Sequence, residues 1–150
     1  MKAMNQEQAK RVCDRVLALS KADECSVVIE GSRVGNVRFA RNSVSTAGLT
    51  ENMQLMVRVA FGKRSGTAVI NEFDDKSLER AVRRAEELAR LAPENPEFVP
   101  ATAKQEYRAT STFVKSTADI DPEFRAQVAA TSIELARKNK LVTAGFFTDS

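Results

Sequence analysis

The sequence predicts an α+β domain in which two or three amphipathic helices pack on a mainly antiparallel sheet. Three observations lead to this fold class. Residues 36–69 alternate between apolar and polar side chains, residues 73–96 switch to a helical repeat, and a second helical repeat occupies residues 121–139. A repeat of two indicates half-buried strands, and a repeat near 3.6 indicates helices with one buried face. The 150 residues, 43% of them hydrophobic, suit one domain with its own core.

The first element is a helix from Asn5 to about Lys21. Its apolar residues recur at steps of three and four, which defines one buried face. Asn5 followed by Gln8 resembles a capping box, with Asn in place of Ser or Thr. We therefore expect the helix to begin next to Asn5.

Two strands are expected next, at residues 25–32 and 33–42. Gly31 is expected to end the first strand. In the second, Val37 and Phe39 share one face, and Asn42 suits a turn or bulge because Asn tolerates left-handed backbone angles.

The clearest strand is "MQLMVRVAF", residues 53–61. Its buried face would consist of Met53, Leu55, Val57, Val59 and Phe61. The polar turn "GKRSG" and the return strand "TAVIN" follow, so the sequence predicts a hairpin here.

A helix follows, capped by Asp74 or Asp75 and ended by Pro93. Its buried stripe is Leu78, Ala81, Val82, Ala85, Leu88 and Ala89. Two ion pairs four residues apart are expected on it, Glu79 with Arg83 and Glu86 with Arg90. The proline-containing residues 93–104 read as an extended surface connection.

The last third begins with a short strand expected within residues 112–121. A helix then starts with Asp121 as its cap and Pro122 at its first position. The stripe expected to be buried is Phe124, Val128, Leu135 and Ala136. Residues 141–150 begin another strand, and we expect the chain to be a piece of a longer protein.

Composition limits the function classes. The net charge is only +3 with acidic and basic residues interspersed, so no direct nucleic-acid binding is expected. No signal peptide or membrane-length apolar run is visible, so we expect a cytoplasmic protein with no membrane partner. Cys13 and Cys25 lack metal-ligand spacing, and a disulfide between them is disfavoured in that compartment.

The sequence contains no histidine, which removes the commonest general base and zinc ligand. The pair Asp74 and Asp75 is better explained as a helix cap than as metal ligands. Asp119 and Asp121 lack the glycine and closing glutamate of a calcium loop. We therefore expect no catalytic residue, metal site or cofactor in this chain.

An ordered set of segments does indicate a family. The set comprises "VRFARNSVS", then "MQLMVRVAFGKRSGTAVIN", then "DDKSLERAVRRAEELARLAPENPEF". In this order and spacing the chain resembles the amino-terminal domain of the TldD/PmbA family, proteins often described as modulators of DNA gyrase. The positions that carry the resemblance are Arg38, Phe39, Ala40 and Asn42; Val57, Arg58 and Val59; Gly66 and Ala68; and Leu91 through Pro96.

The resemblance implies residues 1–150 of a longer two-domain protein in a dimer or other homo- or hetero-oligomer. Members of one branch are zinc metalloproteases that cleave peptides, and the zinc belongs to the carboxy-terminal domain. This chain would then be a non-catalytic domain that forms a wall of the substrate chamber and part of the subunit interface. Two alternatives stay open, namely a stand-alone interaction module linked to DNA gyrase modulation and an oligomerisation domain.

A peptide or unfolded protein is the substrate that this reading implies. Such a chain could be held by adding a strand to a sheet edge, which recognises backbone more than side chains. The candidate edge is residues 36–45, with Arg38, Arg41 and Asn42 as polar contacts. Basic residues on an edge strand also discourage aggregation, so an ordinary surface remains the competing explanation.

Overall fold

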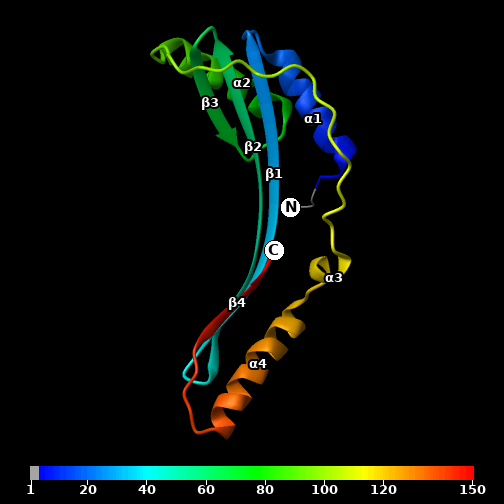
Figure 1. The fold of residues 1–150 in the computed structure, drawn as a ribbon, viewed down its shortest axis with the longest axis vertical. Helices are drawn as coiled ribbons and strands as arrows, with labels where there is room; N and C mark the ends of the chain where they lie inside the picture. The colour runs from blue at the N-terminus through cyan, green and yellow to red at the C-terminus, as the bar shows by residue number, and fades with distance from the viewer. Residues whose placement is uncertain (1–3) are drawn as a thin grey trace. The chain divides into compact units, whose positions relative to one another are not determined.

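A computed structural model describes residues 4–150. The helices and strands are α1 (Gln6–Leu19), β1 (Glu24–Ala40), β2 (Ser43–Phe61), β3 (Arg64–Ile70), α2 (Asp75–Leu91), α3 (Lys115–Ala118), α4 (Pro122–Lys138) and β4 (Gly145–Asp149). The strands form one antiparallel sheet in the order β3-β2-β1-β4 (Figure 1). The α+β fold class predicted from the sequence is confirmed.

The chain divides into two compact units. Unit 1 comprises the residues up to Gly31 together with Met53–Tyr107, and unit 2 comprises Ser32–Asn52 and Arg108–Ser150. β1 and β2 are long enough to contribute to both units. Each unit has its own hydrophobic core, so each is described by itself.

The core of unit 1 lies between the sheet and its two helices. Its buried members are Val16, Leu55, Val57, Val59, Leu78, Ala81, Val82, Ala85 and Ala89. Every β2 and α2 residue in this set belongs to a stripe that the sequence predicted. α1 adds Val16, and Figure 1 shows α2 lying against β3.

Helix caps were predicted correctly. The side chain of Asn5 accepts a hydrogen bond from the Gln8 amide, and the Gln8 side chain accepts one from the Asn5 amide. Asp74 accepts from the amides of Lys76 and Ser77. The Ser77 side chain, together with these amide hydrogen bonds, holds the pKa of Asp74 below its usual value. α2 ends at Leu91, two residues before Pro93.

The hairpin between β2 and β3 is confirmed, but its turn is shorter than expected. Gly62 has the positive φ of 56° that a tight turn needs. Gly66 lies inside β3, paired with Val59, and not in the turn. A Cβ at Gly66 would lie 2.2 Å from the carbonyl oxygen of Ala85, so this glycine allows α2 to pack directly on the strand.

Glu86 is buried in unit 1, although the sequence indicated a surface ion pair. Its carboxylate accepts hydrogen bonds from the Lys21 amide at 2.7 Å and the Arg83 guanidinium at 2.8 Å. Arg90 lies 3.9 Å away, as expected, whereas Arg83 pairs with Glu86 and not with Glu79. Burial alone would raise the pKa of Glu86, but these hydrogen bonds and charges outweigh it and lower the pKa.

Unit 2 has a smaller core. It is built from Val37, Phe39, Ala129 and Ile133, with Phe147 packed against them. Val37 and Phe39 share one face of β1, as predicted, and α4 covers that face (Figure 1). β4 pairs antiparallel with β1 from Gly35 to Phe39.

Three expectations about these elements are wrong. Gly31 does not end a strand, because β1 continues through it from Glu24 to Ala40 with β2 as its neighbour. The short strand expected within residues 112–121 is a helix, α3, whose last residues precede the Asp121 cap. β2 begins at Ser43 and not near Met53.

The buried face of α4 also differs from the expected one. Ala136 is buried as expected, but Phe124 and Leu135 are exposed, and Arg125, Ala129 and Ile133 are buried. The reason is an ion pair that hydrophobicity does not reveal. Arg125 points into the unit and bonds Asp149 of β4 at 2.8 Å, which rotates the buried stripe by one residue.

Among residues 4–150, no helix combines the length and the apolar character that crossing a membrane requires.

Candidate peptide-binding edge

The edge of β1 that the sequence indicated for peptide binding is occupied. β4 pairs with β1 in a register that places Val37 opposite Phe147 and Arg38 opposite Phe146. The backbone groups of Gly35–Phe39 on that side therefore bond another strand of the same chain. Within the edge expected at residues 36–45, the expectation of a free edge is therefore wrong for residues 36–39, because residues 145–149 complete the sheet there.

One open edge runs along the first half of β2. β3 pairs with β2 only from Leu55 to Phe61, so within residues 4–150 the stretch Ser43–Asn52 has a neighbouring strand on its β1 side alone. Every residue of this stretch is exposed. An edge strand of this length presents unpaired N–H and C=O groups that can pair with another polypeptide.

The side chains of this edge do not protect it from pairing. From Ser43 to Thr50 the sequence reads "SVSTAGLT", with no charged residue and no proline. Proteins usually block exposed edges with lysine, proline or a bulge. Residues 43–50 therefore lack the usual features that block strand pairing.

An apolar hollow lies beside the same edge. It has a volume of about 290 Å³ and lies between β2 and the first turn of α4. Its lining residues are Asn36, Val37, Val44, Ala47, Gly48, Leu49, Pro122, Arg125 and Ala126. Val44 and Leu49 each keep nearly half of their surface exposed, so a bound strand could bury apolar side chains here.

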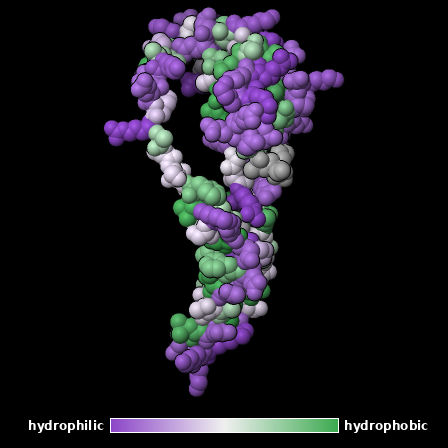
Figure 2. Space-filling model, turned by 90° about the vertical axis from the view of Figure 1, so that its right-hand side faces the viewer, coloured by the Kyte–Doolittle hydropathy of each residue, from purple (hydrophilic) through white to green (hydrophobic). Residues whose placement is uncertain are grey.

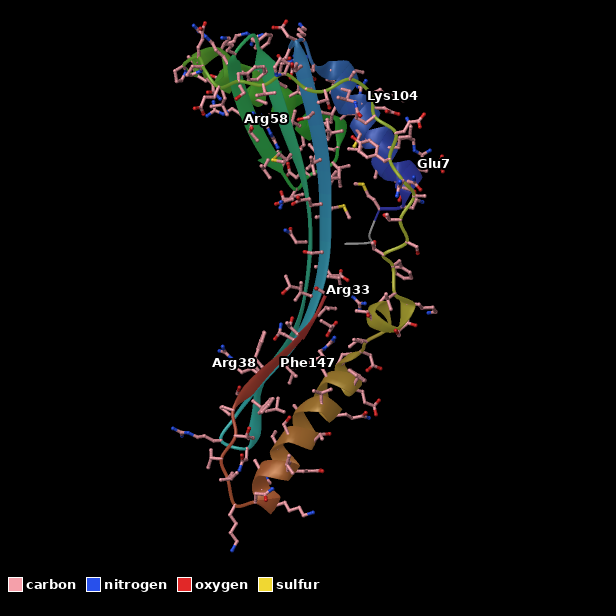
Figure 3. The ribbon with its side chains drawn as sticks, in the orientation of Figure 1. Glu7, Arg33, Arg38, Arg58, Lys104 and Phe147 are labelled. Carbon is pink, nitrogen blue, oxygen red and sulfur yellow. The ribbon has the colours of Figure 1, made fainter. Side chains whose placement is uncertain are left out.

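Arg38 lies on the sheet face turned away from α4. Figure 3 shows Arg38 and Phe147 on opposite sides of the sheet, with Phe147 directed toward α4. The guanidinium of Arg38 is 5.8 Å from the centre of the Phe146 ring across the strand pair. This contact orients the Arg38 side chain over β4 and leaves its charge exposed.

Arg41 and Asn42 form the turn between β1 and β2. Both have positive φ, 51° and 59°, which confirms the turn expected at Asn42. The Asn42 amide group donates to the carbonyl of Leu141 at 2.8 Å and accepts from the amide of Thr143 at 2.7 Å. Asn42 is thus engaged in holding the α4–β4 connection against the turn, whereas Arg41 is exposed.

The ion pair between Arg125 and Asp149 supports the sheet behind the edge. The two side chains are 4% and 12% exposed. Gly35 of β1 leaves room for this pair, since a Cβ there would lie 2.1 Å from an Arg125 nitrogen. β1, β4 and α4 are therefore fixed to one another next to the hollow.

Catalytic groups are not brought together near this edge. Residues 4–150 contain no cluster of three or more His, Cys, Asp or Glu side chains that could hold a metal, and the sequence has no histidine. These residues do not fit a zinc site. Cys13 and Cys25 are free and partly buried, and burial raises the pKa of both thiols, which is opposite to the activation of a nucleophile.

Residues 4–150 thus form a small α+β domain in which an open strand edge lies beside an apolar hollow. The sequence family described as PmbA/TldA metallopeptidase domain 1 matches residues 25–89. Residues 25–89 therefore match the first domain of the TldD/PmbA family, in agreement with the resemblance seen in the sequence. None of the curated proteins matches the chain.

Solved structures share this fold over nearly the whole chain. TldE from Thermococcus kodakarensis matches with a TM-score of 0.77 and 18% identity over 93% of this chain. A proposed modulator of a DNA gyrase from Thermotoga maritima matches with a TM-score of 0.73 and 19% identity over 93% of this chain. A proposed modulator of DNA gyrase from Bacteroides thetaiotaomicron matches with a TM-score of 0.72 and 14% identity over 97% of this chain. The chain covers 32%, 32% and 40% of these three proteins, respectively.

Proposed function

We propose that this chain is the non-catalytic amino-terminal part of a TldD/PmbA-type metallopeptidase that acts on unfolded or precursor peptides. It would form a wall of the substrate chamber and part of the interface between subunits. The family match supports the assignment. The exposed apolar side chains of unit 2, seen in green in the lower half of Figure 2, offer a surface for such contacts.

Hydrolysis in this proposal takes place elsewhere in the parent protein. A zinc ion bound by another domain would polarise the peptide carbonyl and activate water. Among residues 4–150, no group of three or more His, Cys, Asp or Glu side chains is placed to hold that ion. The part of this chain is to bind the polypeptide in an extended conformation.

The observation that carries the proposal is the open edge of β2. Between Ser43 and Asn52 all residues are exposed, and Glu51 is the one charged residue. The stretch lies beside an apolar hollow. An extended peptide paired with this edge gains main-chain hydrogen bonds. Its side chains alternate between the two faces of the sheet, so every second one points to the side of the hollow. Recognition would depend weakly on peptide sequence, which suits an enzyme that acts on unfolded chains.

A neutral hexapeptide of alternating Thr and Val, blocked at both ends, tests this edge. We expect its addition to shift the amide NMR signals of residues 43–50 and to slow their hydrogen exchange. The same peptide with alternate amide nitrogens methylated is the matched control, because it keeps the side chains and loses the hydrogen-bond donors. Binding of both peptides with equal affinity would contradict strand pairing.

Variants of the protein give a second test. Leu49→Lys should weaken binding about tenfold, because a lysine on an edge opposes strand addition. Val69→Lys places the same change on an exposed residue of β3 and should leave the affinity unchanged. Arg41→Glu and Arg38→Glu report whether these side chains contact the peptide, and an unchanged affinity would remove them from the site.

A further inference from the structure

Four cationic side chains gather at one end of unit 2. Arg41 lies in the β1–β2 turn, and Arg137, Lys138 and Lys140 lie at the end of α4 and just after it. All four are exposed. We call this group the basic tip.

Hydrogen bonds hold the basic tip in one arrangement. Arg137 donates to the carbonyl of Asn42 at 2.7 Å, and the Asn42 side chain bonds the backbone of Leu141 and Thr143. The turn and the α4–β4 connection therefore lie side by side, as Figure 1 shows. The charges are presented from a fixed surface.

Within residues 4–150, no carboxylate forms an ion pair with a member of the basic tip. The ion pairs of unit 2 are Arg33 with Glu51, Lys115 with Asp119 and Arg125 with Asp149, and none includes a member of the tip. Unit 1 contains equal numbers of acidic and basic residues, so the whole net charge of +3 arises in unit 2. A positive field is thus concentrated at this end of the unit.

Two of these cations occupy backbone positions that favour glycine. Among residues 4–150, the non-glycine residues with positive φ are Arg41, Asn42 and Lys140, and all three are at the tip. Lys140 follows α4, where the Leu141 amide closes the helix by bonding the Ala136 carbonyl at 2.8 Å. Glycine is the usual residue at such a helix end. A residue with a side chain in this left-handed conformation lowers the free energy of unfolding by about 1 kcal/mol.

Helix stability does not account for all four charges. Arg137 and Lys138 lie in the last turn of α4, where cations interact favourably with the helix dipole. Arg41 and Lys140 lie outside the helix at left-handed positions, where their side chains make the fold less stable. Binding of an anionic ligand is a reason for placing charge there.

The neighbours of the cations indicate the kind of ligand. Leu141 and Val142, between the cations and β4, are 62% and 77% exposed. Surfaces that bind nucleic acid are polar and charged, whereas cations interspersed with aliphatic side chains suit a polypeptide with acidic and apolar residues. The open edge of β2 begins at Ser43, directly after the turn that carries Arg41.

We propose that the basic tip binds acidic residues at one end of the extended polypeptide that pairs with β2. This inference rests on the proposed function and adds the substrate class, namely extended chains in which an acidic segment flanks an apolar strand. The strand segment bonds the backbone of β2, and the carboxylates reach the tip. Acidic flanking residues thereby select which end of the polypeptide lies toward the turn.

Tailed versions of the Thr-Val hexapeptide test the proposal on the 150-residue chain. Three glutamates are added at the amino end or at the carboxyl end, and three glutamines at the same places serve as controls. One of the two glutamate peptides should bind about tenfold more tightly than its glutamine control at low salt. The gain should disappear near 1 M salt, where the Debye length is about 3 Å.

The double variant Lys138→Gln/Lys140→Gln should remove this gain and leave the affinity for the neutral hexapeptide unchanged. Lys63→Gln/Lys104→Gln makes the same charge change in unit 1 and should retain the gain. If the neutral peptide binds β2 and glutamates add nothing, the basic tip has no such function while the edge proposal stands. If only the glutamate peptides bind, and through the tip, the edge proposal fails.

Two further outcomes would overturn the proposal. In one, no peptide binds at all. In the other, a DNA duplex or vesicles containing anionic lipid bind more tightly than the glutamate peptides, and the lysine variant abolishes that binding. The tip would then serve a different class of macromolecule.

Discussion

Unit 1 and unit 2 use their apolar residues in different ways. In unit 1 two helices cover one face of the sheet and bury a continuous core that includes Leu55, Val57 and Val82. In unit 2 only four buried hydrophobic residues, with Phe147 packed against them, form the core. Many of its large hydrophobics remain exposed, namely Val44, Leu49, Phe113, Val114, Phe124, Leu135, Leu141, Val142 and Phe146.

This difference suggests that one unit contributes most of the stability and the other provides surface for binding. Exposed hydrophobic surface contributes nothing to folding until a partner covers it. We therefore expect unit 1 to be the more stable part of the domain, and unit 2 carries the surfaces from which we infer binding. Substitutions in the two units should give different results, and hydrogen exchange read segment by segment can distinguish them.

The largest effect is expected from Gly66→Val in unit 1. The new side chain would meet the backbone of α2, because even a Cβ would lie 2.2 Å from the Ala85 oxygen and 2.4 Å from the Ala89 nitrogen. Backbone atoms of a packed helix cannot move aside as a flexible side chain can. We expect a loss of about 4 kcal/mol in the free energy of unfolding, measured by denaturant titration.

Gly48→Ala is the matched control in unit 2. Its Cβ would meet only the Asn36 side chain, at 3.5 Å, which is an ordinary contact. The free energy of unfolding should change by about 0.5 kcal/mol or less. If both glycine variants destabilise equally, the close approach of α2 to β3 is not the reason for Gly66.

Glu86→Gln should have the next largest effect. The substitution removes the charge that accepts hydrogen bonds from Arg83 and the Lys21 amide while keeping the shape of the side chain. Because Glu86 is only 2% exposed, breaking this network should cost about 3 kcal/mol. Protection from hydrogen exchange should fall in α1 and α2.

The effect of Glu86→Gln should also depend on pH. The folded protein lowers the pKa of Glu86 from its ordinary value of 4.5, so the folded state binds this proton more weakly than the unfolded state. The stabilisation is therefore complete above the ordinary value and is lost as pH falls through the lower folded pKa. The stability difference between wild type and variant should shrink on acidification, and a constant difference would contradict this assignment.

Local signals in the sequence were sufficient for most of the fold. The capping box of Asn5 and Gln8, the Asp74 cap and the strand repeat at residues 53–61 act over a few residues, so their patterns are directly visible. Gly66 was misplaced because its cause is the distant backbone of α2. The face of α4 was misassigned because Arg125 is buried by a partner 24 residues away.

The candidate site was less predictable for the same reason. Only the pairing of β4 with β1 reveals that β1 is covered and that β2 is open. One signal was present in the sequence, namely the run from Ser43 to Thr50 without charge or proline. The basic tip was not visible, since hydrogen bonds of Asn42 bring together segments about a hundred residues apart.

Apart from the control variants, the smallest effect on the free energy of unfolding is expected from Lys140→Gly, and it has the opposite sign. Lys140 has φ of 55°, which glycine adopts without a steric cost. The variant should therefore stabilise the chain by about 1 kcal/mol, visible as slower exchange in the last turn of α4. It should also reduce the affinity for the glutamate-tailed peptide about threefold, because one of the four charges of the basic tip is lost.

The matched substitution is Lys115→Gly, which removes a cation of unit 2 outside the basic tip. It breaks the exposed pair with Asp119 at the first position of the short helix α3, so it should slightly destabilise the chain and leave peptide affinity unchanged. A stabilised Lys140→Gly protein that binds the acidic peptide as tightly as wild type would mean that the strain at Lys140 has no part in binding. Stabilisation together with weaker binding would mean that unit 2 keeps this charge at the expense of its own stability.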